Sequence, residues 1–82
     1  MNKSSLKRYK DNLQGEIDAS AMYREMAEME TDANKASIYL KLATIEDRHA
    51  DFWRDQMIKA GGDPSRMNVS ARTKVMIWLG RN

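Results

Sequence analysis

The sequence predicts an all-α protein made of an antiparallel two-helix hairpin and a short C-terminal helix. Its 82 residues include one proline and four glycines, while alanine, methionine, leucine, glutamate, lysine and arginine dominate, a composition typical of helices. Apolar residues recur at helical spacing in two long runs, which a short polar turn separates. A chain this short forms a single domain, residues 1–82, and buries only about 60 to 65% of its unfolded surface.

Composition also excludes several classes of protein. Cysteine is absent, which excludes disulfides, thiolate metal sites and a rubredoxin-type iron centre. Basic and acidic residues are interleaved and the net charge is only +2, so nothing indicates nucleic-acid binding. The sequence has no run of about 20 apolar residues and no signal-peptide segment at its N-terminus. We therefore expect a soluble, cytoplasmic chain.

The first helix is predicted from about residue 4 to residue 29, with Ser4 or Ser5 as its N-cap. One side carries apolar and small residues at helical spacing: Leu6, Tyr9, Leu13, Ser20, Tyr23 and Ala27. Glu16 falls within that side, three residues after Leu13. The charged residues of the other faces are expected to be solvated, namely Lys10, Asp18, Arg24, Glu25 and Glu28.

The polar turn at residues 30–34 leads into a second helix, predicted from about residue 33 to residue 60 with Thr31 or Asp32 as its N-cap. It stops at Gly61-Gly62-Asp63-Pro64. So short a connection makes the two helices antiparallel neighbours. A third helix is predicted from about residue 71 to residue 79, capped by Ser70 and ended by Gly80. It needs a partner surface for Val75, Met76, Trp78 and Leu79.

Glu46 and the only histidine, His49, lie three residues apart in the second helix and therefore on one face. That face is the apolar stripe of the helix, which also carries Tyr39, Leu42, Ala43, Ala50, Trp53 and Met57. An ionised carboxylate in an apolar interior is unfavourable by several kcal/mol unless a cation or hydrogen-bond donors compensate it. A metal ion is one such compensation.

Glu16 and Glu46 each lie about 15 residues from the turn, so at 1.5 Å rise per residue they reach a similar level of the hairpin. Glu16, Glu46 and His49 are therefore expected to converge. Two oxygens and one nitrogen suit iron, manganese or zinc better than calcium or magnesium. Glu-x-x-His alone occurs by chance in roughly one chain in ten of this size, where it is usually a surface ion pair. Its conjunction with Glu16 favours a metal site.

The other notable side chains have simpler interpretations. The methionines at helical spacing, Met22, Met26, Met29 and Met57, predict flexible core filler. Asp47 and Asp51 are expected to be solvated. Arg72, Lys74 and Arg81 flank apolar residues and could touch a membrane surface, but packing of the third helix on its own bundle is the preferred interpretation.

These residues resemble a known family. Gly15-Glu16 followed by Tyr23, and Ile45-Glu46-Asp47-Arg48-His49-Ala50 after them, resemble the first half of a ferritin-like di-iron domain of the rubrerythrin type. Residues 12–62 with the tail 71–79 are most similar to the ferritin-like domain that precedes a vacuolar-iron-transporter-type membrane domain in some bacterial proteins. The spacing also resembles that of encapsulated ferritins. The resemblance implies that Glu16, Glu46 and His49 are the catalytic metal ligands, Glu46 bridging two ions, and that Tyr23 donates a hydrogen bond to a ligand.

A complete site of this family takes a glutamate from each of two helices and a Glu-x-x-His from each of two others. This chain contains half of that set. Either two chains dimerise into a four-helix bundle and share the di-iron site, or these residues lead a longer protein. In the second case the chain is the cytosolic domain of a membrane protein with a C-terminal iron-transporter domain.

The expected function is therefore a ferroxidase that binds Fe²⁺ and oxidises it with O₂ or H₂O₂, for iron storage, detoxification or delivery to a transporter. Manganese or zinc could substitute for iron. One alternative is a rubrerythrin-like peroxidase, which the absence of cysteine disfavours. The other is a helical dimerisation module without catalysis.

Overall fold

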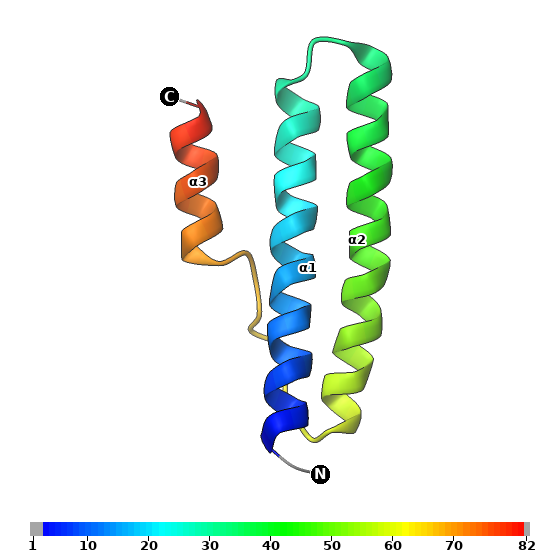
Figure 1. Cartoon of the computed structure of the whole chain (residues 1–82), viewed down its shortest axis with the longest axis vertical. Helices are drawn as coiled ribbons and strands as arrows, with labels where there is room; N and C mark the ends of the chain where they lie inside the picture. Colours follow the sequence, from blue (N-terminus) through cyan, green and yellow to red (C-terminus); the bar gives the residue numbers. More distant parts are fainter. Residues whose placement is uncertain (1–2, 82) are drawn as a thin grey trace.

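A computed structural model describes residues 3–81, so residues 1, 2 and 82 of the predicted domain lie outside the described range. Its three helices are α1 (Lys3–Met29), α2 (Ala33–Lys59) and α3 (Ala71–Arg81), and the described residues form no strand. The antiparallel helices α1 and α2 pack along their length, and α3 lies beside α1 on the side away from α2 (Figure 1). The predicted all-helical class, with two long packed helices and a short third one, is confirmed.

The ends of α2 follow local sequence signals. Asp32 is its N-cap, and its side chain accepts hydrogen bonds from the backbone N–H groups of Asn34 and Lys35 at 2.9 and 3.1 Å. After the helix, Gly61 adopts a positive φ of 85°, a backbone conformation that favours glycine.

Two predicted helix ends are wrong. The chain is already helical at Lys3, so Ser4 and Ser5 lie inside α1 and neither precedes it as an N-cap. Gly80 does not end α3, which continues to Arg81. The side chain of Arg81 pairs with Glu25 of α1, and this tertiary contact holds the last turn of α3 beyond the predicted end.

The core between α1 and α2 is thin. Leu13 is fully buried, and it packs with Ala50 and Met57 of α2. The partly buried side chains around them are Leu6, Tyr9, Ile17, Trp53 and Met67. Met57 is core as predicted, but the same prediction is wrong for Met26 and Met29, which are 39% and 54% exposed because nothing described covers that side of α1.

The polar anchors of α3 lie on the face of α1 turned away from α2. Asp18 accepts hydrogen bonds from both Ser70 N and Ser70 Oγ at 2.8 Å, and Ser70 Oγ caps α3 by accepting from Thr73 N at 3.2 Å. At the other end of α3, Arg81 binds both carboxylate oxygens of Glu25 at 2.5 and 2.6 Å. The prediction that Asp18 and Glu25 are solvated is therefore wrong, because α3 covers this face.

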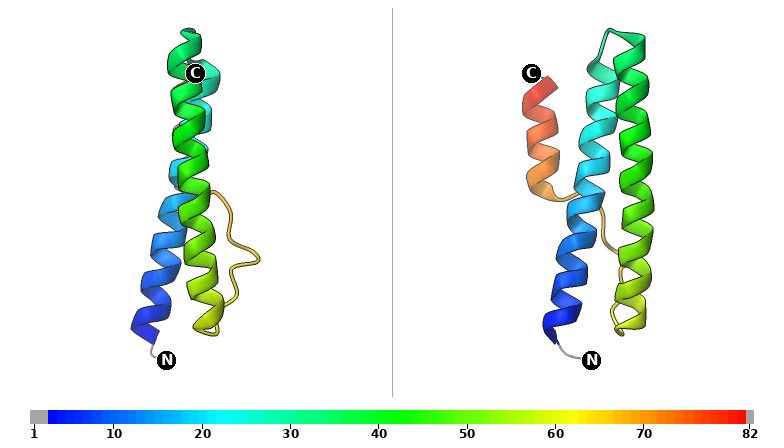
Figure 2. Two further views of the ribbon diagram at one scale, coloured as in Figure 1. Left: turned by 90° about the vertical axis from the view of Figure 1, so that its right-hand side faces the viewer. Right: turned by 45° about the vertical axis from the view of Figure 1, so that its right-hand side comes forward.

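The three helices form a layer one helix thick, as the edge-on view shows (Figure 2, left). Its extents are 47 × 24 × 17 Å. The chain exposes 5989 Å², whereas a compact protein of this mass exposes about 5,000 Å². A single layer leaves its flat faces open except where the loop before α3 packs Met67 against the core. Among residues 3–81, no helix is long and apolar enough to cross a membrane.

Candidate metal centre

Glu16 lies at the middle of α1, on the side that packs against α2. Leu13 and Ser20, three residues before and four residues after it, are both buried on that side. The Glu16 side chain is 22% exposed. Helical periodicity thus directs this carboxylate into the seam between the two long helices.

Glu46 and His49 face Glu16 from α2. Nδ1 of His49 lies 3.6 Å from Oε2 of Glu16 and 3.6 Å from Oε1 of Glu46. The Glu46 side chain is 22% exposed and that of His49 is 55% exposed. The imidazole therefore closes the outer side of the carboxylate pair and stays in contact with solvent.

The buried oxygen of Glu16 has no hydrogen-bond partner among the described residues. Its distance of 3.6 Å to His49 Nδ1 is longer than a hydrogen bond. A buried acceptor left unpaired is unfavourable by about 1 to 3 kcal/mol. This orphaned oxygen lies where a cation would satisfy it.

The electrostatics of the group point the same way. Burial raises the pKa of the Glu16 carboxyl above its ordinary value of 4.5, and the neighbouring carboxylate of Glu46 raises it further. His49 acts in the opposite direction but does not cancel these effects. Because burial and Glu46 shift Glu16 toward its protonated form, a bound cation and a proton would compete for the same oxygen.

The spacing of the donors fits a first-row metal ion. One ligand atom from each of Glu16, Glu46 and His49 lies within 4.8 Å of the other two. Two donors that each lie about 2.0 to 2.2 Å from one ion are at most about 4.4 Å apart, so the 3.6 Å pairs fit directly. The structure thus brings the three predicted ligand residues together as a group of two oxygens and one nitrogen.

Tyr23 does not join this group. It lies seven residues after Glu16, about 10 Å further along α1, and is half-buried. Within the described part of the chain, its hydroxyl makes no hydrogen bond to Glu16 or Glu46. The role that the family resemblance implied for Tyr23 therefore has no counterpart within one copy of the chain.

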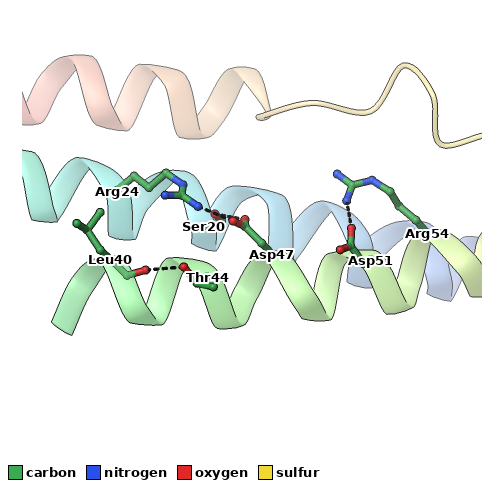
Figure 3. A network of polar contacts seen from close by, with 7 residues as sticks. All are labelled: Ser20, Arg24, Leu40, Thr44, Asp47, Asp51 and Arg54. Atoms are coloured by element: carbon green, nitrogen blue, oxygen red, sulfur yellow. Dashed lines mark hydrogen bonds and ion pairs between the residues drawn. The ribbon is translucent and has the colours of Figure 1, made fainter. Parts of the chain in front are cut away.

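A polar network beside the centre was not predicted. Asp47 accepts a hydrogen bond from Ser20 Oγ at 2.5 Å and forms an ion pair with Arg24, joining α2 to α1 (Figure 3). Arg24 and Asp47 remain about half exposed, at 50% and 47% of their side-chain surface, but the sequence did not predict that they pair with each other. Ser20 could have indicated this network from the sequence, because a hydroxyl on a buried stripe needs a hydrogen-bond partner.

This network holds the two helices in register close to the centre, since Asp47 is the neighbour of Glu46 and Ser20 follows Glu16 by one turn. Asp51 belongs to the same surface, but its partner is Arg54 of its own helix at 3.0 Å (Figure 3). Asp51 is solvated as predicted, with 76% of its side chain exposed.

Comparison with protein-family models, curated proteins and solved structures found no match to this chain.

Proposed function

We propose that this chain is half of a ferroxidase centre, which two copies complete by pairing through the face that carries His49. The observation that carries the proposal is the orphaned Glu16 oxygen inside a group of two carboxylates and one imidazole. A satisfied ion pair would not leave such an oxygen, whereas a cation site would.

The surface around His49 supports the pairing. Ile38, Ile45 and Phe52 are 54%, 42% and 52% exposed. Ile38 and Ile45 precede His49 by eleven and four residues, and Phe52 follows it by three, so these side chains lie near His49 on one stripe of α2. An exposed apolar stripe with a polar group at its centre is typical of a surface that a partner covers.

The chain exposes about 900 Å² more than a compact protein of its mass. Each partner of a standard protein interface buries about 800 Å². A second copy on this face would therefore account for the excess surface. It would also supply a second group of two carboxylates and one imidazole, as a two-fold axis requires.

The residues have separate roles in this proposal. Glu16 and Glu46 offer negative charge in a largely buried place, which favours the ferric over the ferrous state. His49 offers Nδ1, so its proton would be on Nε2. Iron is the substrate: two ferrous ions supply the two electrons that, with two protons, convert O₂ to H₂O₂ or H₂O₂ to two waters.

The test is ferrous oxidation in air, followed by ferric absorbance. Glu46→Ala should reduce the rate to the uncatalysed background, because it removes one of two carboxylates from the centre. His49→Ala should retain weaker binding through the carboxylates. Asp55→Ala is the matched control, since Asp55 is an exposed carboxylate on the same helix.

Equal rates for Glu46→Ala and Asp55→Ala would show that the ligand assignment is wrong. A chain that dimerises but binds no stoichiometric Fe²⁺, Mn²⁺ or Zn²⁺ would instead be a helical dimerisation module.

A further inference from the structure

The outer side of α3 is apolar and exposed. Val75, Met76, Trp78 and Leu79 are each more than half exposed, with values from 52% to 62%. The opposite side of α3 faces α1, because Thr73 is buried and Ile77 is half-buried. An 11-residue helix that shows four large apolar side chains to solvent needs an explanation.

The proposed dimer does not cover the outer edge of this surface, which Val75 and Leu79 form. Val75 and Leu79 are each two residues from Ile77, which places them about 200° away on the helix and so on the side opposite α1. They therefore lie on the side of α3 turned away from α1, and α3 forms one edge of the layer (Figure 1). A copy stacked on the flat face that carries His49 leaves this edge uncovered.

The apolar edge is also the basic part of the chain. Residues 66–81 contain four basic and no acidic residues, whereas residues 1–65 contain ten basic and twelve acidic ones. Glu25 engages Arg81, while Arg72 and Lys74 are exposed on α3 and Arg66 is exposed in the loop that precedes it. Basic side chains and no acidic ones therefore accompany the exposed apolar edge that α3 forms.

We propose that α3 docks its outer edge on an anionic lipid bilayer, with its apolar side chains at the level of the acyl-chain boundary and Arg72 and Lys74 at the headgroups. Tryptophan favours this boundary, since its ring is apolar and its N–H is polar. Helices of this pattern lie on a bilayer and do not cross it. The anchors Asp18–Ser70 and Glu25–Arg81 would fix the hairpin to the docked helix.

A lipid surface fits the dimensions of this edge better than a second copy does. At 1.5 Å rise, α3 offers an edge about 16 Å long and about 10 Å wide. That is far less than the about 800 Å² that each partner of a stable protein interface buries. A bilayer needs little apolar area when headgroup charge contributes to binding.

The test uses the full chain in sedimentation with phosphatidylcholine vesicles and with equimolar phosphatidylcholine–phosphatidylglycerol vesicles. We expect binding to the anionic vesicles only, and weaker binding in high salt. Leu79→Ser and Val75→Ser should each reduce it strongly. Arg72→Gln and Lys74→Gln should each weaken it about five-fold.

The matched controls are Ile58→Ser and Lys41→Gln, an exposed apolar and an exposed basic residue of α2, which should bind as the unchanged chain does. Glu46→Ala should also bind vesicles, so a failed metal centre would not affect this result. The substituted side chains are exposed, and circular dichroism would verify that helicity is kept.

Three vesicle results would each overturn the proposal: no sedimentation with anionic vesicles, equal binding to neutral vesicles, or unchanged binding by both Leu79→Ser and Val75→Ser. A smaller assembly of these two variants in sedimentation velocity without lipid would show that a second copy covers α3, and it too would overturn the proposal.

Discussion

The carboxylate of Glu16 destabilises the metal-free fold, although the proposed metal centre requires it. Its helix directs it into the seam with α2, where one carboxylate oxygen is buried without a hydrogen-bond partner among the described residues. In the metal-free chain that arrangement is unfavourable, and a cation would make it favourable. A purely structural seam would carry an apolar residue at this position.

The raised pKa of Glu16 gives metal-free protein a specific pH dependence. Burial, then Glu46, favours the protonated folded form, so the folded chain binds more protons than the unfolded chain above pH 4.5. The stabilisation that Glu16 contributes to the folded chain is fully present below pH 4.5. It is lost as the pH rises through the raised pKa that Glu16 has in the folded chain. Glu16→Gln should remove this loss and stabilise the metal-free chain at pH 7 by about 1 kcal/mol.

The measurement is urea unfolding in chelator at several pH values and one protein concentration. Glu28→Gln is the control, since the Glu28 side chain is 72% exposed on the same helix and should leave the pH profile unchanged. Identical profiles for Glu16→Gln and the unchanged chain would show that Glu16 is not strained in the empty centre.

Among the secondary-structure elements, α3 depends most on polar contacts. Its buried residue is Thr73, and both of its ends are held by carboxylates of α1, Asp18 and Glu25. The loop that leads to α3 packs closely against Leu6 and Met57 at Gly62. A Cβ added there would lie 2.6 Å from Leu6 Cδ1 and 2.9 Å from Met57 Cγ. The position of α3 is thus decided by a few contacts outside the helix itself.

Asp18→Ala should loosen α3 without unfolding the hairpin. It removes the acceptor of Ser70 N and Ser70 Oγ and should destabilise the chain by about 1 to 2 kcal/mol. Hydrogen exchange should show faster exchange of α3 amides and retained protection in the middle of α1 and α2. Asp11→Ala, an exposed carboxylate of the same helix, is the control.

The Asp18 contact also has a defined pH range. Burial by itself would raise the pKa of Asp18, but the hydrogen bonds from Ser70 and Gln14 outweigh it and lower the pKa below 3.8. Its stabilisation is therefore present above pH 3.8 and is lost as pH falls through the lowered folded value. If α3 exchange is as slow in Asp18→Ala as in the unchanged chain, Asp18 does not anchor the helix.

For the whole molecule, the single layer is the decisive feature. The hairpin has one flat face with the Asp47 network and another with His49 and exposed apolar residues, so the two faces differ in chemistry. Such a layer becomes a two-layer bundle only when another layer covers it.

The face with His49 should therefore form the dimer. Phe52→Ser and Ile45→Ser should each weaken association in sedimentation velocity by about ten-fold, because each removes roughly 1.5 kcal/mol or more of apolar burial. Ile58→Ser, which is 58% exposed on another side of α2, should associate like the unchanged chain. A compact monomer at micromolar concentration would contradict this arrangement.

Metal should stabilise the assembled molecule. At a free ion concentration one hundred times Kd, mass action adds about 2.7 kcal/mol to the free energy of unfolding. Melting temperatures should rise with Zn²⁺, or with Fe²⁺ under anaerobic conditions, and Glu46→Ala should abolish the rise. Asp51→Ala is the control and should keep the rise. A melting temperature of the unchanged chain that does not change when metal is added would contradict the metal centre.

Local signals in the sequence were enough for the helical class, the turn, the Ser70 cap and the level at which Glu16, Glu46 and His49 meet. They limited the cap of α2 to Thr31 or Asp32, of which the structure has Asp32. These features depend on spacing along one helix or on equal distance from one short turn. Both are readable without knowledge of any other contact.

Only the tertiary structure decided what each face of α1 meets. Asp18, Glu25 and Arg24 look alike in the sequence, as charges off the apolar stripe, yet α3 covers two of them and Asp47 engages the third. It also left Met26 and Met29 exposed and Tyr23 apart from the ligands. Helical periodicity fixes the direction in which a side chain points around the axis of its helix. Which element lies in that direction depends on the path of the chain after residue 60.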